Sequence, residues 1–491
     1  MITRVTFLIH LPTYSDEAKW LNFAEIALRD PSQRFIPLTI GVQPLYVWIT
    51  MILLKFRNDP VLVGRLVSVA AGVLSMIGLW LLTKRLFKSK QAAFLSVLVY
   101  IFYPYAIVFD RMVAFESMIG MFYVWSLYLS VLLVEDLKLY VAYTLGFSLA
   151  GGILLKGNAA FSIYLLPFTL ILLNLKKKNV NRTNLIKGAL LSVFSIAIAE
   201  TFYLIIFLSP FAERVMWLTG GVMYTKHEFI KLGVGFVILH LIKNSAIIFQ
   251  FLLDYIKIPY LILLVLALII LFLSKRYREP LLLMFYFLIP VIAIAAFVRD
   301  VPTDRWVYPH TLVLIPLISV GLVYSYKFLK DKFSKKSLKG AILIQLGLFV
   351  IFLLYPMWVV IVYVINPYEA GITNVESYIY CPDWGVRDFI NSLNNSKVQK
   401  QTFIGTYWGN IDAIQLYSYT NKNIISKKYF VGRHVLPEEV ISYSKKMPTY
   451  YVDLGEKENL LGFVKYPITL VSKKTYREGI DCVFKIYKVG N

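Results

Sequence analysis

Residues 61–82 read VLVGRLVSVAAGVLSMIGLWLL, a run of 22 positions in which Arg65 is the single charged residue. A helix of about 20 apolar residues is long enough to cross the hydrocarbon core of a bilayer, which is roughly 30 Å thick. Blocks of the same kind recur at 193–210 (VFSIAIAETFYLIIFLSP) and 257–273 (KIPYLILLVLALIILFL). The repeated blocks predict a polytopic α-helical membrane protein.

The composition of the whole chain agrees with this class. The chain has 491 residues, 58% of them hydrophobic, and a mean hydropathy of +0.65. Soluble proteins contain about 45–50% apolar residues. We expect about 10–11 transmembrane helices, beginning with residues 1–11 as the last turns of a truncated first span. The expected full spans are 60–83, 91–109, 112–134, 139–155, 157–174, 187–207, 256–274, 280–298, 307–326 and 340–365.

The formal charge of +22 is divided among short loops between the expected spans. The basic loops are KRLFKSK (84–90), KKKNVNRTNLIK (176–187), SKRYRE (274–279) and KFLKDKFSKKSLK (327–339). All four fall on one side of the membrane when the spans alternate. Cytoplasmic loops retain Lys and Arg, so this side is expected to be cytoplasmic. The charge is not gathered on one folded module, which argues against a nucleic-acid partner.

The opposite, outer side then carries two long segments, 12–59 and 208–255, and the tail 366–491. Within these segments, 43–56 is apolar but too short to span comfortably, and 229–252 is apolar but interrupted by polar residues. Both are expected to lie along the membrane interface as amphipathic helices, in contact with membrane lipids.

The tail differs in composition from the rest of the chain, because it gains Asn, Ser, Asp and turn residues. TFIGTY (402–407), YYVDLG (450–455), ITLVSKK (468–474) and DCVFKIYKV (481–489) are expected to be strands, and WGVRDFINSLNN (384–395) a helix. We therefore predict a membrane domain at 1–365 and a small outer α/β domain at 366–491. A disulfide between Cys381 and Cys482 is permitted there, and the sequence leaves it open whether they pair.

Several ionisable residues gather at outer ends of spans or at outer corners. They are Asp16 and Glu17 in LPTYSDEAKW (11–20), Arg111 and Glu116 in FDRMVAFESM (109–118), Lys156 in LLKGN (154–158), and Arg299, Asp300, Asp304 and Arg305 in VRDVPTDRWVYP (298–309). Charges at membrane depth are costly and usually face a partner or a polar cavity. Carboxylates beside cations suit transfer of a group from a phosphate, since cations neutralise the phosphate and a carboxylate deprotonates the attacking hydroxyl.

In order along the chain, these stretches resemble the membrane-embedded glycosyltransferases of the GT-C class. The nearest branch is that of the protein O-mannosyltransferases and aminoarabinose transferases. The matching pieces are TYSDEAKW (13–20), QPLYVWITMILLKF (43–56) with VGRLVSVAAGVLSMIGLWLLTKRLF (63–87), FDRMVAFESM (109–118), LLKGN (154–158) and DRWVYPHTLVLIPL (304–317). The resemblance covers roughly residues 12–325.

This resemblance implies a GT-C fold and an inverting transfer on the outer face of the cytoplasmic membrane. A sugar would move from a polyprenyl-phosphate donor to a hydroxyl of a protein, lipid or glycan acceptor. Asp16 matches the expected catalytic base, with Glu17 positioning the loop or the acceptor. Arg111 and Glu116 would support that loop, and the candidates for binding the donor phosphate are Lys156, Arg299, Arg305, Tyr308 and Gln43.

Two features depart from the family pattern: the first span is only a stub, and Gln43 stands where relatives often have Lys. No cofactor is indicated; a divalent cation is possible, but no metal ligand set is expected. The strongest alternative function is a flippase or transporter of lipid-linked sugars without transferase activity. Such a protein would place charges near the bilayer midplane and would show repeated halves.

Overall fold

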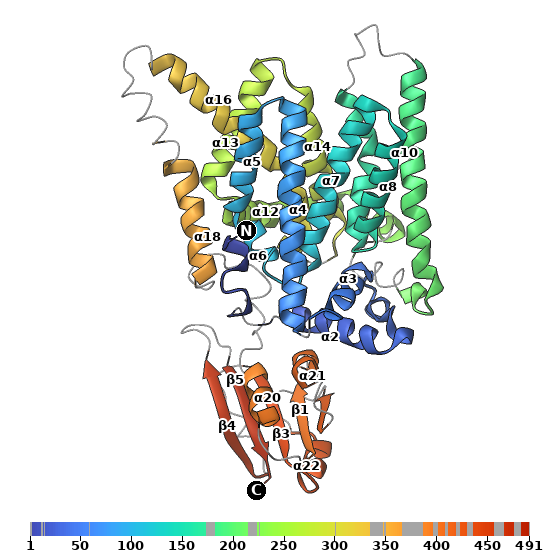
Figure 1. The fold of residues 1–491 in the computed structure, drawn as a ribbon, viewed down its shortest axis with the longest axis vertical. Helices are drawn as coiled ribbons and strands as arrows, with labels where there is room; N and C mark the ends of the chain where they lie inside the picture. The colour runs from blue at the N-terminus through green and yellow to red at the C-terminus, as the bar shows by residue number, and fades with distance from the viewer. Residues whose placement is uncertain are drawn as a thin grey trace. The chain divides into compact units, whose positions relative to one another are not determined.

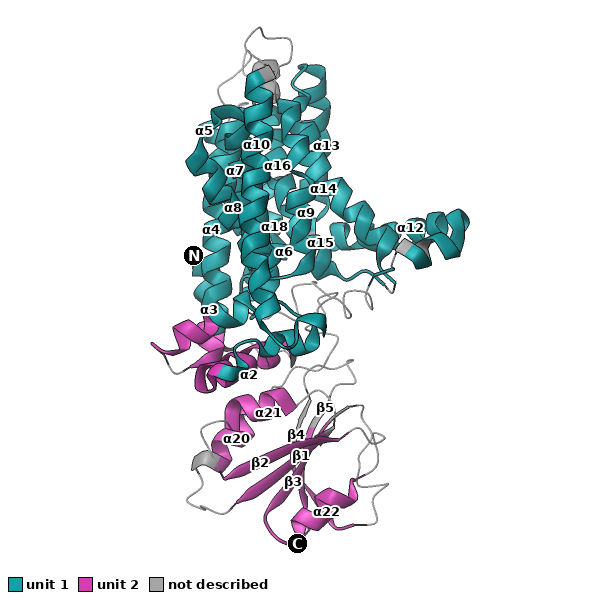
Figure 2. Ribbon diagram, turned by 90° about the vertical axis from the view of Figure 1, so that its right-hand side faces the viewer, with its two compact units in different colours: residues 1–8, 32–49, 64–374 teal, residues 9–31, 50–63, 375–491 magenta. Residues whose placement is uncertain are grey.

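The computed structural model describes residues 2–10, 13, 15–57, 59–172, 182–214, 223–224, 226–299, 301–333, 347, 350–365, 386–395, 401–407, 411–418, 423–429, 436–455, 466–475 and 483–490. Contacts divide the chain into two compact units (Figure 2). Unit 1 comprises residues 1–8, 32–49 and 64–374, and unit 2 comprises residues 9–31, 50–63 and 375–491. The short helical turns η1 (Leu8–His10) and η2 (Pro31–Gln33) lie where the chain passes from one unit to the other.

Unit 1 is helical (Figure 1). Its elements are α1 (Ile2–Val5), η3 (Ile36–Ile40), α3 (Leu45–Leu54), α4 (Pro60–Phe87), α5 (Lys90–Ile101), α6 (Pro104–Phe109), α7 (Phe115–Asp136), α8 (Leu139–Ile153), η4 (Gly157–Ala160), α9 (Phe161–Tyr164), η5 (Leu166–Leu172), α10 (Arg182–Tyr203), η6 (Leu204–Leu208), α12 (Lys226–Ile256), α13 (Ile258–Leu273), α14 (Arg278–Phe297), α15 (Asp304–Thr311), η7 (Leu312–Leu314), α16 (Ile315–Phe333), η8 (Val350–Leu354) and α18 (Tyr355–Ile365). The last residues of α3 and the first of α4 belong to unit 2.

In the part of the chain that the structure describes, six helices are long and apolar enough to cross a membrane. They cover Pro60–Phe87, Phe115–Asp136, Thr183–Leu208, Ile230–Asp254, Arg278–Phe297 and Asp304–Lys327, and shorter apolar helices cover Leu45–Leu54, Lys90–Ile101, Leu139–Ile153, Gly157–Leu172, Ile258–Leu273 and Phe352–Ile365. The predicted polytopic helical fold is confirmed. The expected single span 91–109 is wrong in detail, because the chain turns before Pro104 and forms two helices, α5 and α6. A proline disfavours the helical conformation of the residue that precedes it, which accounts for the break.

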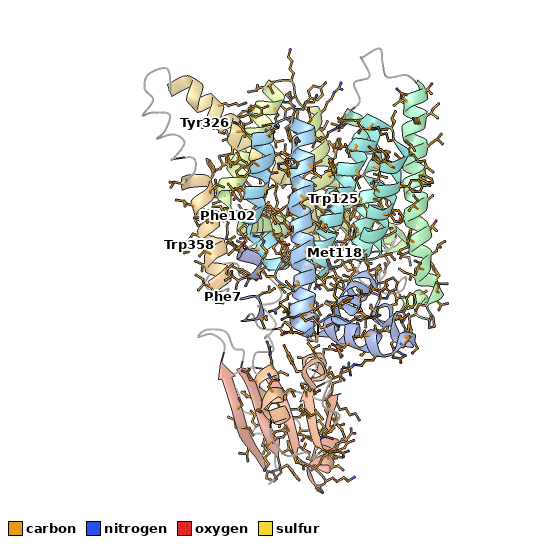
Figure 3. The ribbon with its side chains drawn as sticks, viewed as in Figure 1. Phe7, Phe102, Met118, Trp125, Tyr326 and Trp358 are labelled. Atoms are coloured by element: carbon orange, nitrogen blue, oxygen red, sulfur yellow. The ribbon has the colours of Figure 1, made fainter. Side chains whose placement is uncertain are left out.

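The outward faces of the bundle carry apolar side chains, as a lipid-exposed surface requires. On α10, Leu190 is 64% exposed and Val193 is 62% exposed. Figure 3 shows mainly carbon atoms in the side chains that project from this helix, whereas Met118 lies among the inner helices. Inside the bundle, a Cβ on Gly321 of α16 would lie 2.3 Å from the Leu263 carbonyl oxygen of α13. Small residues allow such close backbone approach in membrane bundles.

Helix α12 differs from the other long helices of unit 1. Its backbone kinks at Gly233, where φ is 76°, a value that glycine adopts without strain. In Figure 2 it projects sideways from the long helices, and Ile230, Val234 and Leu239 along it are exposed. The segment is also long enough to span a membrane. Its sideways direction is the one that an interfacial helix would take, and the interfacial position of 229–252 stays a prediction.

Unit 2 contains a five-stranded sheet. Its elements are α2 (Ser15–Arg29), α20 (Val386–Asn395), β1 (Thr402–Tyr407), α21 (Ile411–Ser418), β2 (Ile424–Tyr429), α22 (Glu438–Ser444), β3 (Thr449–Gly455), β4 (Ile468–Thr475) and β5 (Val483–Val489). The strand order is β2-β1-β3-β5-β4, with β1 parallel to β2 and β3, and β5 antiparallel to β3 and β4. Strands at 402–407, 449–455, 468–475 and 483–489 and a helix at 386–395 are present, so the predicted small α/β fold of the tail is confirmed, while its outer position stays a prediction. The strand β2 and the helices α2, α21 and α22 were not expected.

The sheet is covered on both faces. The crossover β1–α21–β2 moves in one direction along the sheet and β2–α22–β3 moves in the other, so right-handed connections place α21 and α22 on opposite faces. Val440 of α22 packs with Phe403 and Tyr451. Tyr450, which points the opposite way from Tyr451, meets the ring of Phe389 from α20 at 5.1 Å. Cys381 and Cys482 lie outside the described residues.

The units cut across the predicted boundary between residues 365 and 366. Residues 9–31 and 50–63 cluster with the C-terminal domain, because α2 packs against α21. The predicted division of the chain into 1–365 and 366–491 stays a prediction.

Candidate functional site

The acidic pair begins a helix. Asp16 and Glu17 occupy the first turn of α2, where the positive end of the helix dipole favours carboxylates. The side chain of Asp16 is 20% exposed, and its Oδ1 accepts from Lys19 Nζ at 3.0 Å. Glu17 is only 1% exposed. Of the two carboxylates, Asp16 is therefore the one that a molecule from outside unit 2 can reach.

In unit 1, Glu116 and Lys156 are brought together although 40 residues separate them. Lys156 Nζ lies 3.1 Å from Glu116 Oε1; the Glu116 side chain is buried, and the Lys156 side chain is 27% exposed. Glu116 is in the first turn of α7, and Lys156 precedes η4 in the turn after α8. The arrangement holds one cation at a fixed place while part of it stays accessible.

Gln43 lies beside this pair. The start of α3 lies next to the turn after α8, where the Leu45 N–H donates to the Leu154 carbonyl at 3.1 Å. A Cβ on Gly157 would lie 3.8 Å from Gln43 Nε2, and Gln43 also hydrogen-bonds with Tyr203. We call Gln43, Glu116, Lys156 and Tyr203 the Lys156 cluster.

Arg111 anchors the beginning of the chain. Its Nη1 donates to the carbonyl oxygens of Thr3 and Thr6 at 2.7 and 2.8 Å. Arg65 likewise donates to the Leu8 carbonyl at 2.7 Å. The segment that leads into α2 is thus fixed by buried guanidinium groups, which satisfy backbone carbonyls that would otherwise be unpaired.

The residue before Arg111 forms a buried ion pair that the sequence did not predict. Asp110 accepts from Arg4 Nε at 3.2 Å, from the Tyr100 hydroxyl at 3.1 Å, and from Ser117 Oγ at 2.5 Å. A Cβ on Gly72 of α4 would lie 2.4 Å from this carboxylate, so glycine provides its space. Burial raises the pKa of the Asp110 carboxyl, and the adjacent Arg4 opposes that shift.

Arg299 lies in another part of unit 1, just after the end of α14, and contacts Glu228 in the first turn of α12. Its Nη2 contacts both carboxylate oxygens of Glu228 at 2.6 Å, and its guanidinium lies 5.3 Å from the ring centroid of Tyr224. The isolated bridge between Met223 and Val298 holds these segments together. Arg299 is already paired with an anion here, so Glu228 competes for its positive charge with any phosphate that Arg299 binds.

Arg305 and Tyr308 both belong to α15. The Arg305 backbone N–H donates to Asp304 Oδ1 at 2.8 Å, and the residue is half-buried. Tyr308 is completely buried, and its ring lies 4.7 Å from that of Phe109 and 5.7 Å from that of Tyr105. Tyr308 therefore belongs to an aromatic cluster in the core of unit 1. Asp300 lies outside the described residues.

The residues described in the structure contain no group of three or more His, Cys, Asp or Glu side chains that could hold a metal ion.

Comparison with known proteins agrees with the predicted resemblance. Residues 41–203 match the model of the dolichyl-phosphate-mannose-protein mannosyltransferase family. This region contains the whole Lys156 cluster and the Asp110–Arg111 corner. No curated protein matches the sequence.

Solved structures of GT-C glycosyltransferases share the fold. The archaeal oligosaccharyltransferase AglB from Archaeoglobus fulgidus, in complex with an inhibitory peptide and a dolichol-phosphate, matches with a TM-score of 0.57 at 13% identity, over 90% of this chain and 66% of that one. ArnT from Cupriavidus metallidurans matches in the apo state with a TM-score of 0.55 at 12% identity, and bound to undecaprenyl phosphate with 0.54 at 13% identity. Both ArnT matches cover 96% of this chain and 93% of ArnT.

The chain spans about two thirds of the length of the oligosaccharyltransferase that it matches, and nearly the whole of ArnT. The predicted GT-C fold and the resemblance to membrane glycosyltransferases are confirmed.

Proposed function

Because the chain is a multi-pass membrane protein with the fold of the GT-C glycosyltransferases, we propose that it transfers a sugar from a polyprenyl-phosphate donor to an acceptor hydroxyl. The transfer inverts the configuration of the sugar and takes place on the outer face of the cytoplasmic membrane. The carrying observation is the match to ArnT along nearly the full length of both chains, since one of those structures holds undecaprenyl phosphate.

In the proposed reaction, the Asp16 carboxylate accepts the proton of the acceptor hydroxyl. The hydroxyl oxygen bonds to the anomeric carbon as the bond from that carbon to the phosphate oxygen breaks. Polyprenyl phosphate leaves with the bonding electrons, and a single displacement inverts the anomeric centre. Cations stabilise the charge that develops on the leaving phosphate. The partial exposure of Asp16 supports its assignment as the base, and the burial of Glu17 supports a positioning role.

For the donor phosphate we propose Lys156 as the principal cation, with Gln43 beside it. An ammonium group has three protons, so Lys156 can donate to Glu116 and to a phosphate oxygen at once. Arg299 and Arg305 are proposed as further phosphate contacts, with Tyr308 supporting them from the core.

Replacement of Lys156 tests this assignment. Lys156→Met is expected to raise the KM for the donor about ten- to a hundredfold, the range for loss of a hydrogen bond to a charged group. The control is the double variant Lys156→Met/Glu116→Gln, which removes the unpaired buried carboxylate. A donor KM that stays high in the double variant supports phosphate binding. Recovery of the wild-type KM would mean that Lys156 only neutralises Glu116.

The ion pair between Arg299 and Glu228 gives a second prediction, in which the KM for the donor falls instead of rising. Glu228→Gln removes the anion that competes with phosphate, so the KM for the donor is expected to fall by up to about fivefold, the equivalent of a partly exposed ion pair. Donor titrations of both proteins measure this change. If Glu228→Gln leaves the KM unchanged while Arg299→Gln also has no effect, Arg299 only holds the segment after α14 against α12 and does not bind the donor.

The activity itself is tested in membranes that contain the full chain, with undecaprenyl-phosphate mannose, glucose and aminoarabinose as donors. Release of undecaprenyl phosphate together with sugar incorporation into an acceptor would support the proposal. Movement of the intact lipid-linked sugar across the bilayer without release would overturn it in favour of a flippase.

A further inference from the structure

Within unit 2, the helix that begins with the proposed base packs directly on the C-terminal domain. α2 contacts α21, and α21 in turn contacts the edge strand β2 (Figure 2). Asn22 Nδ2 of α2 donates to Gln415 Oε1 of α21 at 3.0 Å, and the Thr13 and Tyr417 hydroxyls are 2.5 Å apart. This polar junction fixes α2 relative to the domain.

The junction also contains charged groups. On α2, Asp16, Lys19 and Asn22 are three residues apart and therefore lie along one face of the helix. On α21, Asp412 and Gln415 have the same spacing. Asp412 lies one turn before Gln415, which accepts from Asn22, so Asp412 is on the face of α21 that meets α2. The charges of Lys19 and of Lys428 on β2 attract it, and that of Asp16 repels it. Burial raises the pKa of the Asp412 carboxyl, and Lys19 and Lys428 oppose the shift.

Resting on the proposed function, we infer that Asp412 is a positioning residue for the proposed base. It acts through Lys19, which it shares with Asp16. The C-terminal domain in this way contributes to the chemistry of a residue that lies about 400 positions earlier in the chain.

The physical reason is competition for one ammonium group. Lys19 contacts Asp16 at 3.0 Å and is attracted by Asp412 as well. While Asp412 is ionised, it weakens the hold of Lys19 on Asp16 and adds like-charge repulsion. Both effects make Asp16 a stronger base towards an acceptor hydroxyl. Without the charge of Asp412, Lys19 would bind Asp16 alone and would stabilise its ionised form, which makes the carboxylate a weaker base.

The test measures the rate of sugar transfer by the full chain as a function of pH. The donor is whichever of the three undecaprenyl-phosphate sugars the wild-type protein uses. Asp412→Asn keeps the size of the side chain and removes a half-buried charge, so it is expected to fold as wild type does. The acid limb of the profile is expected to shift to lower pH by about half a unit, because loss of a negative charge several ångströms away lowers the pKa of the base by about that amount. The plateau rate falls severalfold because the base is weaker, and the KM for the donor does not change.

Two matched variants separate electrostatics from structure. Glu438→Gln removes one carboxylate from α22, on the opposite face of the sheet and exposed, and is expected to leave the profile unchanged. Gln415→Met breaks the uncharged hydrogen bond to Asn22, and is expected to lower the rate without moving the acid limb. Asp412→Glu restores the charge and is expected to return the acid limb towards its wild-type position.

The inference is overturned if the Asp412→Asn profile superimposes on that of wild type after scaling, or if Glu438→Gln moves the acid limb equally. These results differ from a failure of the proposed function. In that case wild type itself would release no undecaprenyl phosphate at any pH.

Discussion

Asp16→Asn is expected to lower the kcat of sugar transfer by about 10²- to 10⁴-fold, the contribution typical of a general base. Asn cannot accept the proton of the acceptor hydroxyl, but it keeps the size and the hydrogen-bonding capacity of the side chain. Because the donor phosphate contacts are proposed on other residues, the KM for the donor should change little. Initial rates of undecaprenyl phosphate release, measured in membranes with equal amounts of each protein, check this prediction.

Neighbouring carboxylates provide the controls. Asp30→Asn changes an exposed carboxylate just after the end of α2 and is expected to retain wild-type activity. Glu17→Gln changes the buried partner and is expected to have an intermediate effect, because the proposed role of Glu17 is to position the first turn of α2 without contacting substrate. Equal rates for wild type and Asp16→Asn would remove Asp16 from the reaction. A larger loss in Glu17→Gln than in Asp16→Asn would exchange their roles.

Most membrane helices could be predicted because each one is specified locally. A long apolar run fixes a helix wherever its partners are, and the expected spans 60–83 and 112–134 correspond to Pro60–Phe87 and Phe115–Asp136. The strands β1 and β5 were also predictable from their β-branched and aromatic residues. These elements need little information from distant parts of the chain.

Elements that depend on a distant partner were missed. β2 has the sequence IISKKY, whose charged half shows no regular alternation, and it becomes a strand because β1 pairs with it in parallel. The helix α2 lies within the predicted outer segment 12–59, in which no helix was expected at 15–29. Its first-turn acids are a helix-start signal that could have indicated it. Its packing on α21, nearly 400 residues away, could not be read from the sequence.

In the candidate site, too, the residues themselves could be predicted from the sequence, but their distant partners could not. The sequence indicated that Glu116 and Lys156 are charged residues at outer corners, but not that they form a pair. Asp110 was adjacent to the predicted Arg111 and was still overlooked, because its partner Arg4 lies in the first turn of the chain. Glu228 and Asp412 had no sequence signal that separates them from ordinary surface carboxylates. In each case the missing information is the position of an oppositely charged group across the fold.

The Arg4–Asp110 pair gives the largest expected effect on stability. Asp110→Ala leaves the Arg4 guanidinium buried beside an empty space at Gly72, and arginine cannot discharge by losing a proton. Breaking a buried ion pair in this way costs about 3–5 kcal/mol. Thermal unfolding of the purified full chain in detergent should therefore show a markedly lower Tm. The double variant Arg4→Met/Asp110→Leu removes both charges and is expected to be more stable than Asp110→Ala alone.

The reciprocal change should cost less and should depend on pH. In Arg4→Met, Asp110 loses its cation but can bind a proton, and burial already raises the pKa of this carboxyl in the wild-type protein. Without Arg4 that pKa is higher still, so the folded state binds more protons than the unfolded state over the interval between the usual value and the raised one. Stability then falls as the pH rises through this interval. The Tm deficit of Arg4→Met relative to wild type should therefore shrink on acidification, whereas that of Asp110→Ala should persist. If both deficits stay constant between pH 5 and pH 8, Asp110 does not titrate in the variant and the pair is held by packing and not by charge.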